Sequence, residues 1–476
     1  MPVTNRDILK IYWRAARNHK PSLFFAVLGV VGGGTVWVIT PIYFKTFFDL
    51  LTHSGTPDSL YPQLLTVFFT LVGLTVIGWA LNRIADFGNN RFQTSVKAEL
   101  KEHAFSSLLH HSYAFFANSF AGALVRRVHR LSSDGFEVFA DKMLWMLLPL
   151  FVQLTGTVIV LFFHLPIFAF AFLVWFVIFV SVQISLSLWK MKYDKIRAER
   201  DTESTAVLSD ALTNHPTIQL FARKKFEFKK FRDITQSLRR IMLFTWNVSA
   251  TIDAVQFALF IVIEYVILYL ALQAWRDGLI TVGTFILLQS YVMQIFGRLW
   301  DFGRSVRAIY TSFADAREMV EVMLLPIDVV DVPSAKALTV VKGEIVFDRV
   351  SFSYHKTRKV LDRFTTTIRA GERIALVGHS GAGKSTIVKV LLRLHDLESG
   401  KILIEGCDIQ KVTQDSLRQS IAFVPQEPLL FHRSLAENIR YGRLDATDDE
   451  LKEASRLAHC IEFITDLPNG YDTLVG

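Results

Sequence analysis

The chain has 476 residues, of which 51% are apolar and 40 are phenylalanine, and its formal net charge is +8. So high an apolar fraction is rare in soluble globular proteins and indicates membrane-spanning segments. The two cysteines, Cys407 and Cys460, imply no disulfide framework, and we expect both to be small buried hydrophobic residues.

Six long apolar segments precede residue 306. Each is long enough to cross a hydrocarbon core of about 30 Å. Core helices of a soluble protein and helices lying on a lipid surface are alternatives, but neither fits residues 166–188, which carry no charge and are hydrophobic all round. The predicted spans are residues 22–51, 60–82, 137–163, 165–189, 248–275 and 282–300.

The distribution of basic residues predicts the orientation of these spans. Lys and Arg gather in residues 1–21 and in the two long connections, 83–136 and 190–247, whereas Arg276 is the only basic residue of the opposite connections. Positive charge favours the cytoplasmic side, so the N-terminus and both long connections are predicted to be cytoplasmic. The net charge therefore needs no nucleic-acid partner, and we interpret the basic stretch 223–230 as a solvated helix face near lipid headgroups.

Both long connections are predicted to be helical. Apolar residues recur at helical spacing through residues 87–109 and 196–212. We expect the membrane helices to continue into the cytosol, to turn near residues 113–122 and 214–217, and to return.

A β-rich region follows a linker at residues 326–342. Thr447 and Glu450 form a predicted capping box at the start of a later helix. The predicted strands are residues 344–347, 350–354, 364–368, 373–377, 402–404 and 421–424, with 373–377 buried.

Residues 378–386 read Gly-His-Ser-Gly-Ala-Gly-Lys-Ser-Thr and fit the pattern G-x-x-x-x-G-K-[ST]. Glycines allow backbone N–H groups to turn toward a phosphate, and the start of the predicted helix 385–392 adds a favourable partial charge. Lys384 would reach the β- and γ-phosphates, and the Ser385 hydroxyl would bind Mg²⁺. A chance match in a glycine-rich turn is the alternative, which the predicted strand before the loop and helix after it argue against. The candidate binding residues are Gly378, His379, Ser380, Gly381, Ala382, Gly383, Lys384, Ser385 and Thr386.

Six spans with two long cytoplasmic connections, followed by this loop, resemble a half-transporter of the ATP-binding cassette (ABC) exporter family, with the type IV exporter fold. The resemblance covers essentially the whole chain. Val350-x-Phe352-x-Tyr354 is similar to the family's aromatic loop, whose tyrosine stacks on adenine. Val424-Pro425-Gln426 is similar to the Q-loop, whose glutamine contacts Mg²⁺ and the γ-phosphate side. Neither Tyr354 nor Gln426 alone would indicate the family, but the order and spacing of their motifs around the phosphate loop are specific to it.

The resemblance implies a multi-pass α-helical membrane domain of six transmembrane helices with long cytoplasmic extensions, followed by an incomplete P-loop α/β nucleotide-binding domain. The implied boundaries are residues 1–325 for the membrane domain, 326–342 for the linker and 343–476 for the nucleotide-binding domain. ATP and Mg²⁺ are the implied cofactors, with Ser385 and Gln426 as metal ligands and Gln426 as a catalytic residue. The two cytoplasmic turns would be coupling helices.

The family's signature and Walker B motifs would follow Gly476. We therefore expect the chain to be a fragment that is not catalytically competent by itself. The implied function is ATP-driven export of an unknown small molecule, lipid or peptide across the plasma or inner membrane. The implied partner is a second half-transporter in a homodimer or heterodimer. The alternatives are a non-hydrolysing nucleotide-binding membrane regulator and an ATP-gated, channel-like subunit.

Glu264 is the one carboxylate near the middle of a predicted span. At 1.5 Å per residue it lies about 24 Å into the fifth span, where an ionised carboxylate is costly. It is a candidate substrate-cavity residue that would contact a cationic substrate or carry a proton. The alternative is a protonated carboxyl that hydrogen-bonds a neighbouring helix, for instance through Gln289 or Tyr291.

Overall fold

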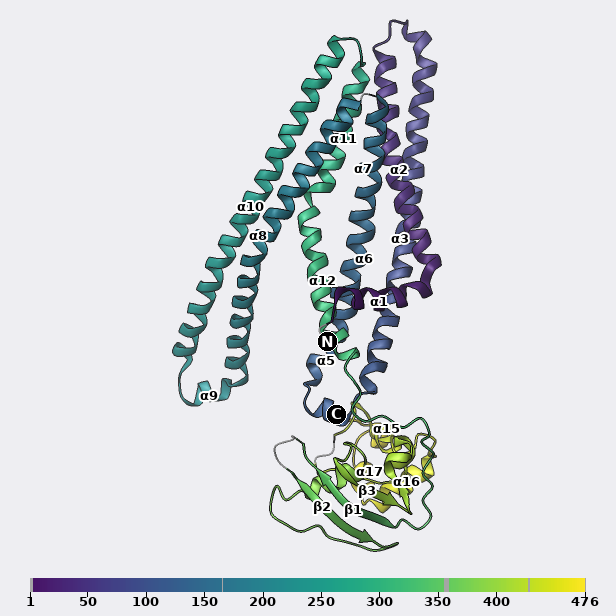
Figure 1. Cartoon of the computed structure of the whole chain (residues 1–476), viewed down its shortest axis with the longest axis vertical. Helices are drawn as coiled ribbons and strands as arrows, with labels where there is room; N and C mark the ends of the chain where they lie inside the picture. Colours follow the sequence, from purple (N-terminus) through teal and green to yellow (C-terminus); the bar gives the residue numbers. More distant parts are fainter. Residues whose placement is uncertain (1–2, 165, 355–358, 427–428, 476) are drawn as a thin grey trace. The chain divides into compact units, whose positions relative to one another are not determined.

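The computed structural model describes residues 3–164, 166–354, 359–426 and 429–475. The chain divides into two units (Figure 1). The helical unit comprises Met1–His111 and Phe115–Ile327, and the second unit comprises Ser112–Ala114 and Asp328–Gly476.

Long helices form the helical unit, and the amphipathic helix α1 (Asn5–Ala16) runs crosswise to them (Figure 1). Short helices stand at the two predicted turns, namely α4 (Tyr113–Ala117) and α9 (His215–Leu220). One continuous helix over residues 121–163 contains α5 (Ala121–His129), η2 (Arg130–Glu137), α6 (Val138–Lys142), η3 (Met143–Leu147) and most of α7 (Leu148–His164). The other helices are α2 (Lys20–Leu51), α3 (Pro57–Leu109), α8 (Pro166–Thr213), α10 (Lys224–Arg276), α11 (Val282–Trp300) and α12 (Phe302–Met323).

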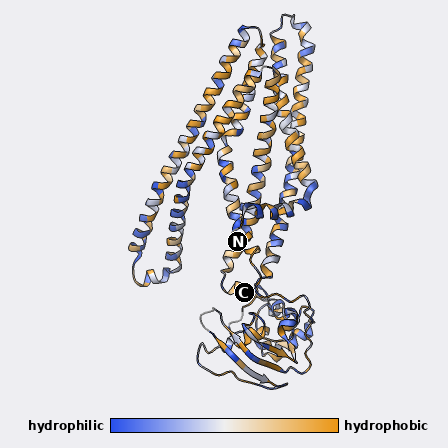
Figure 2. Ribbon diagram, in the orientation of Figure 1, coloured by the Kyte–Doolittle hydropathy of each residue, from blue (hydrophilic) through white to orange (hydrophobic). Residues whose placement is uncertain are grey.

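Among the described residues, five helices are long and apolar enough to cross a membrane. They contain the first five predicted spans, apart from residue 165 at the start of the fourth, which lies outside the described residues. The sixth predicted segment forms α11, which is not one of these five but packs against α2, α7 and α10. In Figure 2 the apolar colour of α8 and α10 gives way to hydrophilic colour toward α9, as expected for spans that continue into a polar extension.

Two glycines allow α2 and α3 to pack closely. A Cβ atom on Gly29 would lie 2.5 Å from the carbonyl oxygen of Leu81, and one on Gly88 would lie 2.7 Å from the backbone nitrogen of Ala26. Neither position tolerates a larger side chain without separating the helices. Small residues serve the same purpose in many membrane helix pairs. In lipid the hydrophobic effect does not drive helices together, so close van der Waals packing of the backbones contributes much of the association energy.

Many phenylalanines lie on the outer surface of the helical unit. Phe69, Phe163 and Phe170 are 65%, 82% and 69% exposed. Lipid-facing aromatic side chains therefore account for part of the phenylalanine content, while Phe168 and Phe172 pack in the core.

The second unit contains an antiparallel sheet in the order β2-β1-β3-β4. Phe347, Val350 and Ile402 are buried in its core, together with Val390 of the helix that follows the phosphate loop. The predicted strands 344–347 and 350–354 both overlap the single strand β1, while 364–368 and 402–404 lie within β2 and β3. The strands are β1 (Ile345–Phe352), β2 (Leu361–Ile368), β3 (Ser399–Ile404) and β4 (Cys407–Asp408), with a separate pair of β5 (Arg433–Ser434) and β6 (Leu474–Val475).

The helices of this unit are short. The predicted capping box is present, with Thr447 accepting from the backbone N–H of Glu450 and Glu450 accepting from that of Thr447. The helices are α13 (Lys384–Leu391), α14 (Gln414–Gln419), α15 (Leu435–Arg440), α16 (Asp448–Leu457) and α17 (Ile461–Thr465).

Two strand predictions are wrong. Residues 373–377 and 421–424 belong to no strand, and Val377 and Val424 are 89% and 90% exposed. An apolar segment forms a buried strand only when neighbouring strands pair with it and helices cover it, and no described strand pairs with either segment. The expected burial of both cysteines is also wrong, because Cys407 is exposed and Cys460 is half-buried.

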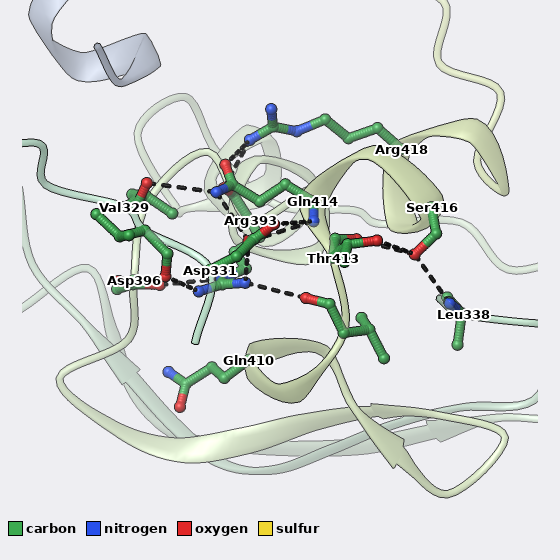
Figure 3. Close-up of polar contacts among 12 residues, drawn as sticks. Val329, Asp331, Leu338, Arg393, Asp396, Gln410, Thr413, Gln414, Ser416 and Arg418 are labelled. Atoms are coloured by element: carbon green, nitrogen blue, oxygen red, sulfur yellow. Dashed lines mark hydrogen bonds and ion pairs between the residues drawn. The ribbon is translucent and has the colours of Figure 1, made fainter. Parts of the chain in front are cut away.

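A buried guanidinium ties the predicted linker to the second unit (Figure 3). Arg393 is only 3% exposed. It donates to a carboxylate oxygen of Asp331 at 3.1 Å and to the carbonyl oxygen of Val330 at 2.9 Å. The side-chain amide of Gln414 donates to the same carboxylate oxygen at 3.0 Å. A buried guanidinium needs partners of this kind, because an unpaired one would lose its hydration without compensation.

Candidate nucleotide-binding site and membrane cavity

The phosphate loop has the backbone conformation that its glycines permit. Gly381 and Gly383 have φ values of 80° and 90°, in the left-handed region that favours glycine. Gly383 is the N-cap of α13. The loop therefore leads directly into a helix N-terminus, where free N–H groups and the helix dipole favour an anion.

The lysine of the motif lies along the loop. Its Nζ donates to the carbonyl oxygens of Gly378 and His379, at 2.8 and 2.9 Å. Ser385, the first residue after it, is exposed, whereas Thr386 is only 5% exposed. The ammonium group of Lys384 is thus placed beside the loop, within reach of an anion bound there.

Tyr354 lies close to this loop. Its hydroxyl oxygen is 3.3 Å from the hydroxyl oxygen of Thr386. The ring of Phe352 packs edge-on against the Tyr354 ring, with the ring centroids 5.0 Å apart. The ring is still 45% exposed, so part of its surface is available for stacking. The structure thereby brings together two elements that the sequence analysis singled out separately.

Gln426 is not joined to this group by a hydrogen bond among the described residues. It is exposed and lies at a bend outside the described strands. Its proposed contact with Mg²⁺ and phosphate stays a prediction.

The sequence analysis missed an aromatic neighbour of the site. His395 lies 5.3 Å from Tyr354 between ring centroids, nearly perpendicular to it. A lone histidine in a loop carries no recognisable pattern, so only the folded structure identifies this contact.

The helical unit contains a polar cavity of about 700 Å³. Its walls come from α3, α6, η3, α11 and α12, and they carry charges of both signs. Lys142 has no ion-pair partner among the described residues, whereas Asp86 pairs with Arg83 at 2.6 Å. The lining includes Asp86, Asn90, Asp141, Lys142, Trp145 and Arg298.

Two π-helical stretches, η2 and η3, flank the part of the wall that contains Asp141. Wider turns of this kind change the angular spacing of side chains and often occur at functional sites. A carboxylate oxygen of Asp141 accepts a hydrogen bond of 2.6 Å from Gln93, which also donates to Asn89. This side of the cavity therefore has hydrogen-bonded, positioned polar groups, which no feature of the sequence predicted.

Glu264 is not among the residues that line this cavity. Its carboxylate accepts a hydrogen bond of 2.8 Å from the side-chain amide of Gln289 on α11. Tyr291 instead donates to the carbonyl oxygen of Val38 at 2.8 Å. Of the two partners considered from sequence, Gln289 is the one that Glu264 contacts.

The ABC transporter transmembrane region matches residues 23–299, and the ABC transporter domain matches residues 361–472. A solved structure described as a bacterial Atm1-family ABC exporter with ATP bound aligns with a TM-score of 0.82 and 26% identity. That alignment covers 96% of this chain and 80% of the other.

Curated relatives align along most of this chain. "Iron-sulfur clusters transporter ATM1, mitochondrial" of Debaryomyces hansenii is 30% identical over 96% of this chain and 67% of its own length. "Heavy metal tolerance factor 1" of Caenorhabditis elegans is 29% identical, over 95% of this chain and 57% of that protein. "ATP-binding cassette sub-family B member 6" of Xenopus tropicalis is 31% identical, over 92% of this chain and 52% of that protein. The chain thus spans about half to two thirds of the length of these relatives.

The transmembrane region and the nucleotide-binding domain occur in the same order and in the same polypeptide as in these proteins. The chain is therefore a multi-pass membrane protein of the ABC transporter family, with the half-transporter arrangement of one transmembrane region followed by one nucleotide-binding domain.

Proposed function

We propose that the protein binds Mg²⁺–ATP at the 378–386 loop and uses it to drive export of a charged, hydrophilic solute. The observation that carries this proposal is the presence of two sites in one chain. One is the phosphate loop with Tyr354 hydrogen-bonded to Thr386, and the other is the polar cavity of the helical unit. The family membership and the likeness to an exporter with bound ATP support the combination.

In the nucleotide site, backbone N–H groups of the loop would hold the phosphates, and Lys384 would neutralise part of their charge. Tyr354 would stack on adenine. The Ser385 hydroxyl and the Gln426 amide oxygen suit Mg²⁺, which prefers oxygen ligands and takes several of them from phosphates and water. Bound Mg²⁺ would neutralise charge that develops on the transferred phosphoryl group. Gln426 would contribute to catalysis by orienting groups on the γ-phosphate side.

The chemistry of the cavity indicates the class of substrate. Aspartate, asparagine, lysine and arginine side chains line it together with Trp145. A solute that carries both positive and negative groups would find partners for each, whereas a hydrophobic drug would displace water from these groups without replacing its hydrogen bonds, at a cost of about 1–3 kcal/mol for each group. We infer that the exposed phenylalanines face lipid and do not report on the substrate. The names of two relatives refer to iron-sulfur clusters and heavy metals, and any such cargo of this protein would travel as part of a charged, hydrophilic species.

The proposed assembly is a dimer of half-transporters in the bilayer, with identical or different subunits. We propose the plasma or inner membrane as its location, with the N-terminus and the nucleotide-binding domain cytoplasmic. The relative whose name includes the word mitochondrial makes an organelle membrane the alternative, which subcellular fractionation would distinguish.

Uptake into everted membrane vesicles from cells that express the full-length protein tests the proposed function. The probes are a zwitterionic peptide, a dicarboxylate and a hydrophobic cationic dye. We expect ATP-dependent uptake of the peptide, no uptake by Lys384→Ala, and weak uptake by Lys142→Ala. Lys192→Ala is the matched control, because Lys192 is exposed on α8 and does not line the cavity.

Uptake of the dye alone would contradict the inferred substrate class. ATP binding without any uptake would favour a non-hydrolysing regulator. Passive ion conductance that appears only when ATP is added would favour an ATP-gated channel.

A further inference from the structure

A second, smaller pocket of the helical unit lies between the crosswise helix α1 and the long helix α3. Its volume is about 170 Å³, and it shares no lining residue with the polar cavity. Sites for drug-sized ligands occupy about 300–1,000 Å³, so a pocket of this size suits a small ion or one polar group of a larger ligand. Its polar lining consists of Lys10 and Arg14 of α1 and Glu99 and His103 of α3.

Three of these four side chains can donate hydrogen bonds to an anion. Within the described chain, the side chains of Arg14 and His103 form no hydrogen bond or ion pair, and both residues are exposed. The ammonium of Lys10 lies 3.4 Å from the carboxylate of Asp7 in an exposed pair, which contributes little and can rearrange. The pocket therefore offers a guanidinium, an ammonium and an imidazole whose hydrogen-bonding capacity the protein itself hardly uses.

The one carboxylate of the lining is already engaged. The side-chain amide of Asn18 donates to one oxygen of Glu99 at 2.6 Å, and the Nε2 atom of His19 lies 3.1 Å from the other oxygen. Both partners come from the short segment between α1 and α2. These contacts reduce the repulsion that Glu99 would exert on an anion in the pocket.

The exposed apolar residues of α1 show which side of this helix faces lipid. Leu9 and Trp13 are 41% and 61% exposed. Only η1 (Arg17–His19) separates α1 from the membrane helix α2, so α1 lies where the chain enters the bilayer, and exposed apolar and aromatic side chains favour that interface. Successive residues of an α-helix are about 100° apart, so the pocket-lining face of α1 lies roughly opposite to Leu9 and Trp13. The pocket therefore faces away from the lipid.

We propose that this pocket binds a phosphate group, carried either by a soluble phosphate or by an anionic lipid headgroup. The planar fork of Arg14 matches phosphate oxygens in a bidentate arrangement, while Lys10 adds a point charge and His103 adds a donor from the opposite wall. A bound phosphate would bridge α1 and α3 and hold α1 in place. The position of the pocket away from Leu9 and Trp13 favours the soluble source. This site is independent of ATP binding and of the transported solute.

Amide hydrogen exchange in residues 5–19 tests the proposal. The chain is reconstituted into phosphatidylcholine bilayers and titrated with inorganic phosphate, against sodium chloride at equal ionic strength. Opening of α1 would release the anion, so phosphate at about ten times its dissociation constant should slow exchange about tenfold. Arg14→Gln should abolish this protection and His103→Gln should weaken it. Arg14→Lys, which keeps the charge but loses the fork, should give an intermediate result.

Matched controls separate the pocket from other basic groups. Arg17→Gln and Lys101→Gln each remove an exposed positive charge, one directly after α1 and one on α3, and neither residue lines the pocket. Both variants should be protected as the wild type is. Lys384→Ala should also retain the protection, because the phosphate loop belongs to the other unit.

A second bilayer, which contains phosphatidic acid and no free phosphate, distinguishes the two sources. Protection by inorganic phosphate in phosphatidylcholine that Arg14→Gln abolishes would support a soluble ligand. Protection by phosphatidic acid alone, again lost in Arg14→Gln, would support the site and assign it to a lipid headgroup. No protection by either probe, equal protection in the wild type and Arg14→Gln, or equal effects of phosphate and chloride would overturn the proposal.

Discussion

The hydroxyl oxygen of Tyr354 lies 3.3 Å from the hydroxyl oxygen of Thr386. One residue follows the first strand of the sheet, and the other belongs to the helix that begins at the phosphate loop. This contact places an aromatic ring at a fixed position beside the loop, where a base attached to a bound triphosphate could stack on it.

Substitution of Tyr354 should separate the contribution of the ring from that of the hydroxyl. Stacking of a base on an aromatic ring contributes about 1–3 kcal/mol. Tyr354→Ala should therefore weaken ATP binding by roughly five- to a hundredfold, while Tyr354→Trp should be tolerated. Tyr354→Phe, which keeps the ring and loses the contact with Thr386, should have a smaller effect than Tyr354→Ala. Titration with a fluorescent ATP analogue measures these affinities.

Tyr441→Ala is the matched control, because Tyr441 is 55% exposed in the same unit and packs against Phe431. Equal affinities of the wild type and Tyr354→Ala would show that Tyr354 is only a structural aromatic residue.

Loss of the Asp331 carboxylate should destabilise the nucleotide-binding unit. Asp331→Ala leaves the buried guanidinium of Arg393 and the amide of Gln414 without their shared acceptor. An unsatisfied buried donor costs about 1–3 kcal/mol, which we expect as the loss in free energy of unfolding. Urea unfolding of this unit, monitored by limited proteolysis, measures the change in free energy of unfolding. Asp362→Ala is the control, because its ion pair with Lys359 is exposed and contributes about 1 kcal/mol or less.

Glu405 should make the stability of this unit depend on pH. Its carboxylate accepts hydrogen bonds from the backbone N–H groups of Gly343, Lys342 and Val341, and these bonds hold its pKa below the ordinary value of 4.5. A lowered pKa in the folded state means that the stabilisation is present above about pH 4.5 and is lost as the pH falls through the lower, folded-state value.

The corresponding test compares Glu405→Gln with the wild type. The variant should unfold at lower temperature at pH 7, and the difference should shrink as the pH falls below 4.5. Glu398→Gln, at an exposed carboxylate of the same unit, is the control. A difference between Glu405→Gln and the wild type that does not change between pH 7 and pH 3 would exclude the proposed role of these bonds.

Two substitutions of Glu264 should show whether this residue packs between helices or contacts the substrate. Glu264→Gln preserves an acceptor for the amide of Gln289, so a packing role predicts normal expression and unchanged transport. Glu264→Leu removes the acceptor and should lower thermal stability. The measurement is vesicle uptake of cationic and neutral probes. Selective loss of cation uptake by Glu264→Gln would instead place Glu264 in the substrate path.

The features that could be predicted from sequence are those determined over short distances. A membrane span needs about 20 apolar residues in succession, so the spans can be recognised from the long apolar segments of the sequence alone. The phosphate loop and the capping box at Thr447 likewise depend on residues within a few positions of one another.

The features that could not be predicted depend on distant residues. Val377 and Val424 have the composition of buried strands, but burial requires neighbouring strands from elsewhere in the chain. The contact between Tyr113 and His395 joins two residues whose local sequences give no sign of it. The π-helical turns beside Asp141 also lack a sequence pattern, because the residues around them read as an ordinary helix.

Equilibrium binding of ATP to the purified chain in detergent, with and without Lys384→Ala, tests the central claim most directly. A charged hydrogen-bonding group contributes about 1.5–3 kcal/mol, so we predict saturable binding that Lys384→Ala weakens by about ten- to a hundredfold. Lys401→Ala, at an exposed lysine on β3, should bind as the wild type does. Equal binding by the wild type and Lys384→Ala, or no saturable binding by either, would contradict the account.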